Sequence, residues 1–291
     1  MHTLIAKLVA EAPVLTDGAW GTELQALGLA PGGCADEWNL GHPGRVAQVA
    51  RSYVDAGSRI ILTNTFRANR IALHAKDLAE RVVDINRAGV AISREAAGTR
   101  ALVFASIGPS GKLLLTGEVK EPQLREAFTE QAQALATAGA DALVLETMAD
   151  VKEAVIALAA AKETGLPVVA CLVFDSGKAK DRTLMGTTPE QAAEALTQAG
   201  ADVIGANCGV GIAEYVPVCR RLKAATDRPV WIKANAGLPQ IVDGKVVYRT
   251  TPEEFAAHGP ALVDAGAAFV GGCCGTSPAF VRALKAALQL A

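Results

Sequence analysis

The chain has 291 residues, of which 51% are hydrophobic and 20% charged, and its formal net charge is −2. This length suffices for one large α/β barrel or two ordinary domains, and the composition excludes a disordered chain. Without a basic block, nucleic acid and anionic membrane surfaces are poor partners. No apolar stretch approaches the roughly 20 residues of a membrane span, the N-terminus lacks a signal-peptide layout, and six cysteines in such a chain indicate reduced thiols or metal ligands. We therefore expect a cytoplasmic protein.

Eight short apolar runs recur along the chain, as is typical of strands that are buried on both faces. They cover residues 13–16, 59–65, 101–108, 142–146, 167–174, 203–208, 230–235 and 267–273. Segments with apolar residues at intervals of three and four, which predict helices, alternate with these runs. The main ones cover residues 43–56, 78–97, 124–139, 150–164, 189–199, 213–225, 252–265 and 278–289.

A short sequence motif recurs before four of the runs, where a helix-like segment ends in Ala-Gly. The glycines are Gly57, Gly139, Gly200 and Gly266, and each is expected to end its helix with a positive φ. Eight repeated strand–helix units predict an α/β fold, a closed (β/α)8 TIM barrel that forms a single domain over residues 1–291. A doubly wound open sheet is the alternative, but the first strand lacks its GxGxxG turn.

Polar residues follow the ends of the predicted strands, and in such barrels these ends form the active-site face. The residues at this rim are Asp17, Asn64, Thr65, Ser106, Glu146, Asn207, Cys208, Asn235, Cys273 and Cys274. Three cysteines from two different strands therefore fall at one edge of the barrel, although nothing in their spacing requires it.

The adjacent Cys273 and Cys274 could be small buried hydrophobes, and their spacing is unlike that of zinc fingers. Together with Cys208, however, they offer three thiolates for one tetrahedral zinc with a fourth position open to a substrate. We expect one Zn2+ per chain. The remaining cysteines, two of them core thiols and one in a glycine-rich loop without an assigned role, are Cys171, Cys219 and Cys34.

A zinc with three sulfur ligands favours binding a further thiol as its thiolate, which is a strong nucleophile. The pattern therefore predicts alkyl transfer to a small thiol. Asp17 and Glu146 are the candidate catalytic carboxylates, and they would pair with an amino group of the substrate. The backbone amides of Gly18 and Ala19 could hold a substrate carboxylate. The structural alternative for each carboxylate is a helix cap or an ion pair with a nearby arginine.

The chain resembles the zinc-dependent homocysteine S-methyltransferases. The resemblance is carried by Asp17-Gly18-x-x-Gly21-Thr22, Thr63-Asn64-Thr65-Phe66, Ile107-Gly108-Pro109, Glu146-Thr147, Gly205-x-Asn207-Cys208, Asn235-Ala236-Gly237 and Gly271-Gly272-Cys273-Cys274-Gly275-Thr276. It implies a (β/α)8 barrel in which Cys208, Cys273 and Cys274 bind zinc and homocysteine sulfur takes the fourth position. The amino group of homocysteine would meet Asp17 and Glu146, its carboxylate would meet the amides after Asp17, and Asn235 would fill the open position without substrate.

The resemblance leaves the methyl donor open. Residues 63–70 look most like the homocysteine module of cobalamin-dependent methionine synthase, yet this sequence shows no folate or cobalamin module. A betaine enzyme surrounds its quaternary ammonium with aromatic side chains, and two of those tyrosine positions are Arg67 and Thr147 here. The donors considered are therefore a separate corrinoid protein, a small sulfonium compound (S-methylmethionine or S-adenosylmethionine) and, as an alternative, betaine.

Three further hypotheses stay open. The cysteine cluster could store or sense zinc without catalysis. The acceptor could be another thiol or a selenol, although the predicted carboxylate pair favours an amino acid. A Schiff-base aldolase would need a buried strand lysine, and Lys233 is the lysine so placed.

Overall fold

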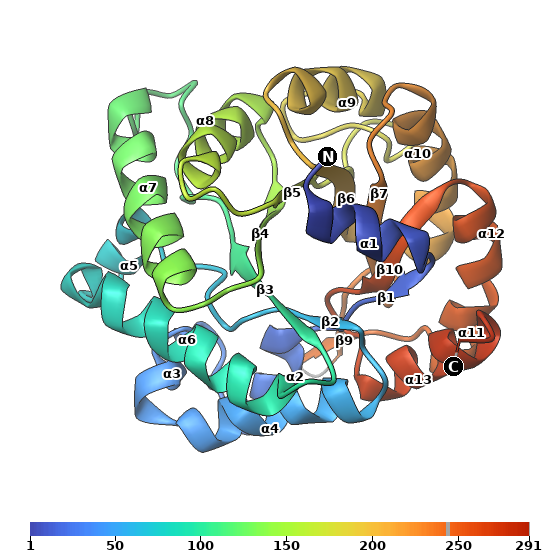
Figure 1. Ribbon diagram of the computed structural model, residues 1–291, viewed down its shortest axis with the longest axis horizontal. Coiled ribbons are helices and arrows are strands. Elements are labelled where there is room, and N and C mark those ends of the chain that lie inside the picture. Colours follow the sequence, from blue (N-terminus) through green and yellow to red (C-terminus); the bar gives the residue numbers. More distant parts are fainter. Residues whose placement is uncertain (243–244, 291) are drawn as a thin grey trace.

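The computed structural model describes residues 1–242 and 245–290. Eight parallel strands form one sheet in the order β1-β10-β7-β6-β5-β4-β3-β2. Their bounds are β1 Val14–Leu15, β2 Ile60–Ile61, β3 Leu102–Ile107, β4 Ala142–Met148, β5 Val168–Leu172, β6 Val203–Gly211, β7 Val230–Asn235 and β10 Ala267–Gly272. A parallel bridge between Thr16 and Ile60 joins the two edge strands, so the sheet closes on itself and the predicted (β/α)8 barrel is confirmed (Figure 1).

Helices surround the barrel, as Figure 1 shows in a view along its axis. Their bounds are α1 Thr3–Ala10, α2 Trp20–Ala26, α3 Trp38–Gly41, α4 Pro43–Asp55, α5 Arg70–His74, η1 Ala79–Arg81, α6 Val82–Ala97, α7 Glu121–Thr137, α8 Val151–Lys162, α9 Pro189–Gln198, α10 Ile212–Ala224, α11 Pro252–Ala257, α12 Gly259–Asp264 and α13 Pro278–Ala287. The four glycines expected to end helices all have a positive φ, between 89° and 105°. None of the helices in the described part of the chain is both long and apolar enough for a membrane span.

Several predicted boundaries were wrong. The single helix expected over residues 252–265 is two helices, because Pro260 lacks the backbone N–H that would continue the first and lies in the first turn of the second. The helix expected from residue 78 begins at Val82 after a 3-10 turn. The strand expected over residues 59–65 covers only Ile60–Ile61, and the residues that follow, Leu62 to Asn64, line the site cavity instead.

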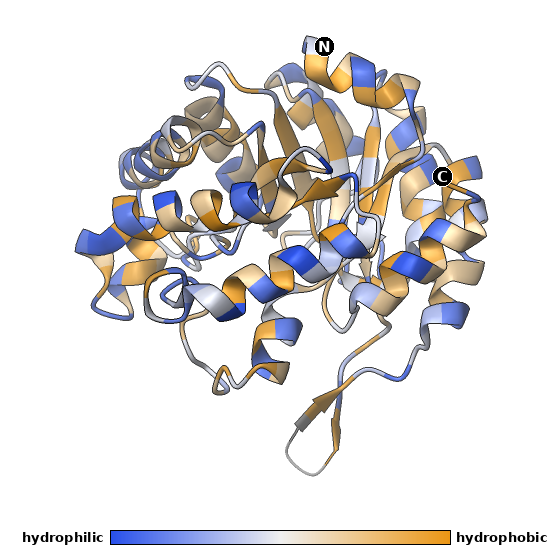
Figure 2. Cartoon of the chain, turned by 60° about the horizontal axis from the view of Figure 1, so that its bottom comes forward, coloured by the Kyte–Doolittle hydropathy of each residue, from blue (hydrophilic) through white to orange (hydrophobic). Residues whose placement is uncertain are grey.

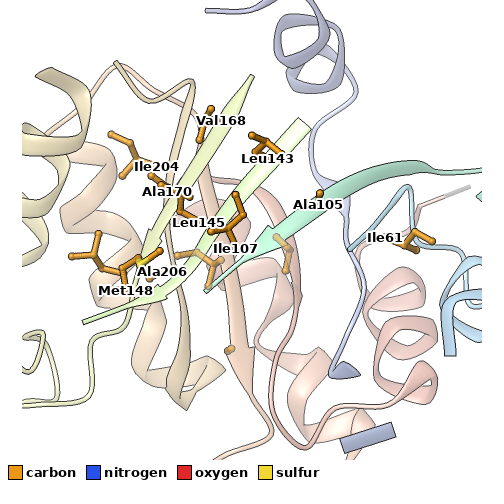
Figure 3. Packing of buried hydrophobic residues seen from close by; sticks show 14 of the residues in the cluster. Ile61, Ala105, Ile107, Leu143, Leu145, Met148, Val168, Ala170, Ile204 and Ala206 are labelled. Atoms are coloured by element: carbon orange, nitrogen blue, oxygen red, sulfur yellow. The ribbon is translucent and has the colours of Figure 1, made fainter. Parts of the chain in front are cut away.

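The barrel strands separate two apolar layers, as the alternation of side chains in a strand requires. Outward-facing residues such as Leu143, Leu145 and Ala170 pack beneath the helices (Figure 3). Inward-facing residues fill the barrel itself. Phe104, Trp231 and Phe269 stack there with ring centroids 6.1 and 5.3 Å apart. The closed interior is therefore packed with side chains up to the layer that carries the polar groups.

The two ends of the barrel differ. Helix α1 lies across one end (Figure 1), where Ile5 and Leu8 join the inward-facing apolar cluster. Beyond β7, at the opposite end, the chain forms an antiparallel hairpin of β8 (Gln240–Val242) and β9 (Lys245–Val247) that projects from the body of the molecule (Figure 2). Neither α1 nor the hairpin was predicted from the sequence. The end covered by α1 is thus closed, and the other end carries the site.

Candidate metal and acceptor site

A cavity of about 260 Å³ lies at the carboxyl ends of the barrel strands. Its walls bring together residues from seven parts of the sequence, among them Gly18, Glu146, Cys208, Lys233, Cys273 and Cys274. Two larger depressions, of about 690 and 460 Å³, lie on the outside between helices and at the end of the barrel near β1. Only the rim cavity combines thiols, a carboxylate and an ammonium group among the described residues.

The three cysteines predicted to act together do converge. The sulfur atoms of Cys208, Cys273 and Cys274 all lie within 4.8 Å of one another, and Cys208 Sγ and Cys274 Sγ are 3.8 Å apart. Two sulfurs on a tetrahedral zinc with Zn–S bonds of about 2.3 Å are separated by roughly 3.8 Å. The separation of Cys208 and Cys274 therefore matches that of two sulfurs on one zinc ion, and Cys273 lies close enough to supply the third.

The protonation behaviour of the thiols also fits a cation. Cys208 has its pKa raised to about 12: its hydrogen bond with Cys273 acts downward, but its contact with Cys274 and its burial act upward more strongly. For Cys274 the hydrogen bond with Cys208 acts downward, but its contact with Cys273 and its burial raise the pKa to about 12. Three thiolates this close repel one another, so a bound divalent cation is what would make their common deprotonation favourable.

The backbone is bent to present these sulfurs. Cys208 has a φ of 65°, which is rare for a residue with a side chain. The register between β6 and β7 shifts between Cys208 and Gly211, as in a β-bulge. Such backbone typically costs about 1–3 kcal/mol and is found at functional sites. At Gly271 a Cβ atom would overlap Thr16, and at Gly272 it would overlap Thr276, so only glycine fits before the two cysteines.

Asn235, the predicted reserve ligand, lies between the peptides that hold the cysteine turn. The Cys273 N–H donates to Ala234 O at 2.6 Å, and the Ala236 N–H donates to Cys274 O at 2.9 Å. The Asn235 amide nitrogen donates to Gly209 O at 3.1 Å, whereas its Oδ1 is buried with no hydrogen-bond partner. A buried oxygen without a donor is unusual, and a metal ion nearby would satisfy it.

Glu146 ends the inward face of β4 and reaches the cavity. It accepts a short hydrogen bond from Ser106 Oγ and a long one, 3.4 Å, from the Asn207 amide. Burial raises its pKa above the ordinary value, and the charge of Lys233 and the Ser106 bond act in the opposite direction. Asn207 also holds Thr147, the residue after Glu146, because it accepts from the Thr147 N–H at 2.6 Å and donates to Thr147 Oγ1 at 2.8 Å.

Asp17 is placed differently from Glu146. Its side chain is fully buried and forms an ion pair with Lys233 Nζ. Its Oδ2 accepts from Trp20 Nε1 at 2.7 Å and from the Leu62 N–H at 2.7 Å. Asp17 is not among the described residues that line the cavity, whereas Lys233 is. The two carboxylates that were predicted to act as a pair therefore face different partners.

The turn after Asp17 forms another wall of the cavity. A Cβ at Gly18 would come within 2.8 Å of Tyr53 Oη and 2.9 Å of Thr276 Oγ1, so glycine is needed there. The Ala19 N–H makes only a long hydrogen bond, 3.4 Å, to Thr276 O. This amide is therefore weakly satisfied and stands at the start of helix α2, where backbone N–H groups favour an anion.

Other rim residues support the frame of the site. Asn64 donates to Ala35 O at 2.7 Å and to Asn39 Oδ1 at 2.9 Å, and Thr65 donates to Ser106 O at 2.7 Å. Cys171 and Cys219 are fully buried free thiols, which confirms that they belong to the core. Cys34 is half-buried, and its thiol is outside the cluster.

Two features of the site were missed from the sequence. Tyr248, just after the hairpin, packs on Gly275, where a Cβ would overlap its ring, and its hydroxyl contacts Cys274. No local pattern signals this contact. Lys233 was noticed only as a possible Schiff-base lysine. Burial alone would lower its pKa, but Asp17 and Glu146 raise it above the ordinary value, which disfavours the neutral amine that Schiff-base chemistry needs.

A (β/α)8 barrel with three convergent cysteine sulfurs beside a buried carboxylate defines a class of barrel proteins with a thiolate metal site at the carboxyl rim. The family model described as homocysteine S-methyltransferase matches residues 14–288. The chain therefore belongs to the homocysteine S-methyltransferase family, a family of methyltransferases.

Among curated proteins, the chain is 32% identical to methionine synthase from Mycobacterium tuberculosis and 31% identical to methionine synthase from Mycobacterium leprae. Each alignment covers 98% of this chain but 25% of the relative, so the chain spans about a quarter of the length of these relatives. Among solved structures, the metallated form of the homocysteine methyltransferase MmuM from Escherichia coli superposes with a TM-score of 0.81 at 25% identity. That match covers 98% of this chain and 99% of the other.

Proposed function

We propose that this chain transfers a methyl group to the thiol of homocysteine, giving methionine, at a zinc site formed by Cys208, Cys273 and Cys274. The observation that carries the proposal is the convergence of the three sulfurs within 4.8 Å at the carboxyl rim. Membership of the homocysteine S-methyltransferase family supports the reaction. The match over nearly the whole of MmuM, which was solved in a metallated form, supports the metal.

Zinc, when bound, would hold the acceptor sulfur as a thiolate at neutral pH. Residues of the chain would bind the other groups of the acceptor. Glu146 has a carboxylate at the cavity wall and would accept hydrogen bonds from the acceptor's ammonium group. The Ala19 and Gly18 amides, on the adjacent wall, would bind its carboxylate. Homocysteine held in this way through the two charged groups on its Cα would direct its thiol toward the cysteine cluster.

Asn235 would serve as the reserve ligand when no acceptor is present. Its buried Oδ1 lacks a donor, and the peptides on either side of it are hydrogen-bonded to Cys273 and Cys274. Exchange of this oxygen for the acceptor sulfur would leave the three cysteines in place. The acceptor would thus bind without a change in the number of metal ligands.

For the donor, we propose a separate methyl-corrinoid protein, with a small sulfonium compound as the second candidate. The 32% identity to a methionine synthase favours the first. The match to MmuM over 99% of its length favours a donor that needs no further module. A betaine cage has little support, since Trp20 and Phe66 are the aromatic side chains among the described residues of the cavity wall.

Zinc analysis followed by X-ray absorption during titration with homocysteine tests the proposal. We expect one zinc per chain with three sulfur neighbours, and a fourth sulfur after homocysteine is added. A screen of methyl-corrinoid protein, S-methylmethionine, S-adenosylmethionine and betaine would then identify the donor by methionine formation. Zinc without a new sulfur would instead support a storage or sensing site. A protein purified anaerobically without zinc would contradict the mechanism.

A further inference from the structure

Three of the roughly four acceptor sites of the Asp17 carboxylate are already used within the protein. One carboxylate oxygen is paired with Lys233 Nζ, and the other accepts from Trp20 Nε1 and the Leu62 N–H, each at 2.7 Å. The residue is 0% exposed. Asp17 is also absent from the cavity wall, which Lys233 lines, so a substrate ammonium could reach Asp17 only by displacing Lys233, whose ammonium would then be buried without its partner.

Lys233 stands between Asp17 and the cavity. On β7 it follows Trp231 by two residues, so both side chains point into the barrel, and Lys233 is the one nearer the rim. Lys233 is 2% exposed and contributes to the cavity wall. Its ammonium therefore occupies the place beside Asp17 that a substrate ammonium would otherwise take.

Glu146, by contrast, keeps accepting capacity toward the cavity. It is 9% exposed, lines the wall, and has one hydrogen bond from Ser106 and one long bond from Asn207. A carboxylate offers about four acceptor sites. At least one site thus stays available to a ligand in the cavity.

We propose that Lys233 is a specificity-determining residue: its ammonium neutralises Asp17, so that Glu146 alone recognises the ammonium group of the acceptor. This assignment rests on the proposed function and sharpens it. The three groups together carry one net negative charge, which matches one substrate ammonium. Without Lys233 the two carboxylates would together carry two negative charges.

The test compares the binding of homocysteine and 4-sulfanylbutanoate, the same thiol acid without the amino group, to zinc-loaded protein by calorimetry. The ratio used is the dissociation constant of 4-sulfanylbutanoate divided by that of homocysteine. A high ratio means strong recognition of the ammonium group. Loss of one charged hydrogen bond commonly changes affinity by about tenfold or more. We therefore expect Glu146→Gln to lower the ratio about tenfold or more.

Asp17→Asn should lower the ratio to a similar degree for an indirect reason, because Lys233 would then pair with Glu146 and compete with the substrate. Adding Lys233→Met to Asp17→Asn should restore the ratio to within about threefold of the wild type, as expected for coupled residues. If Asp17 itself binds the acceptor, the second substitution will not restore the ratio, and that result would overturn the proposal.

Two checks keep the outcome unambiguous. If circular dichroism shows that the double variant is unfolded, Lys233→Met alone decides: the proposal expects a ratio raised about fivefold by the freed Asp17 carboxylate, and an unchanged ratio overturns it. Wild-type protein that binds zinc but not homocysteine would overturn the proposed function and this assignment with it. Homocysteine binding without rescue would overturn only the role of Lys233.

Discussion

Two layers of inward-facing residues, adjacent along the same strands, have opposite characters. The floor layer is the aromatic stack of Phe104, Trp231 and Phe269. The rim layer, one inward-facing step further along the strands, includes Ser106 and Lys233, which follow Phe104 and Trp231 by two residues each. A step of roughly 7 Å along a strand thus separates dry packing from buried charge.

The difference shows how the barrel divides stability from function. Burial of large aromatic side chains in the floor layer is favourable by itself. The rim layer instead contains buried charges and, at Cys208 and Thr147, backbone with φ values of 65° and 60°. Each of these features costs folding free energy unless its partners are present. The floor therefore supports the fold, and the rim depends on that support.

The largest expected effect comes from a substitution in the rim layer that removes a metal ligand. Cys208→Ala should remove the metal and lower homocysteine methylation at least about 100-fold, since even residues that only support ligands cost 10–100-fold. Zinc analysis and a methionine assay measure this, and the thermal midpoint should stay within a few degrees. Cys171→Ala, a core thiol in the same barrel, is the control and should retain zinc. Full zinc occupancy in the Cys208 variant would refute the ligand set.

The next largest effect comes from a substitution in the aromatic floor layer. Trp231→Ala should lower the free energy of unfolding by about 3–5 kcal/mol, because it leaves a cavity in the aromatic stack. Trp231→Phe is the matched control: it keeps an aromatic ring and removes an indole N–H that is buried without a partner, so we expect a loss under about 1.5 kcal/mol. Urea denaturation compares them. Equal losses in both variants would show that the stack contributes little.

The smallest expected effect concerns Asp36, a carboxylate of the rim whose ionised form destabilises the fold. Burial raises the pKa of Asp36, which lines the cavity, from 3.8 to about 6. The contribution of Asp36 to the free energy of unfolding is therefore complete below pH 3.8, the ordinary pKa that applies to the unfolded chain, and is lost as the pH rises through about 6. Asp36→Asn removes this loss and keeps an acceptor for the Arg67 N–H, 2.9 Å away.

The Asp36→Asn variant should accordingly gain stability over the wild type between pH 4 and pH 7, by roughly 3 kcal/mol at most. Urea unfolding of both proteins across this pH range measures the difference. A difference that does not change with pH would mean that Asp36 is not buried as a charged group in the folded protein.

Much of this structure could be predicted from the sequence because the signals are local. Eight apolar runs with polar ends predict the strands and the rim, and glycines with positive φ confirm the predicted helix ends. The convergence of the cysteines follows from the same logic, since parallel strands end at one edge. Helix α1 was missed because its place depends on packing against the distant inward-facing cluster. The hairpin was missed because its strands pair with each other, outside the repeated strand–helix pattern of the barrel.

The sequence by itself thus determined the barrel, the edge at which its polar residues gather and the three sulfurs that meet there. Only the tertiary structure decided how the charges pair. Lys233 and Asp17 are 216 residues apart, and their contact depends on closure of the barrel between β1 and its neighbours rather than on any pattern near either residue. Periodicity specifies which way a side chain points, whereas the partner of a buried charge is set by the register between strands that are far apart in the sequence.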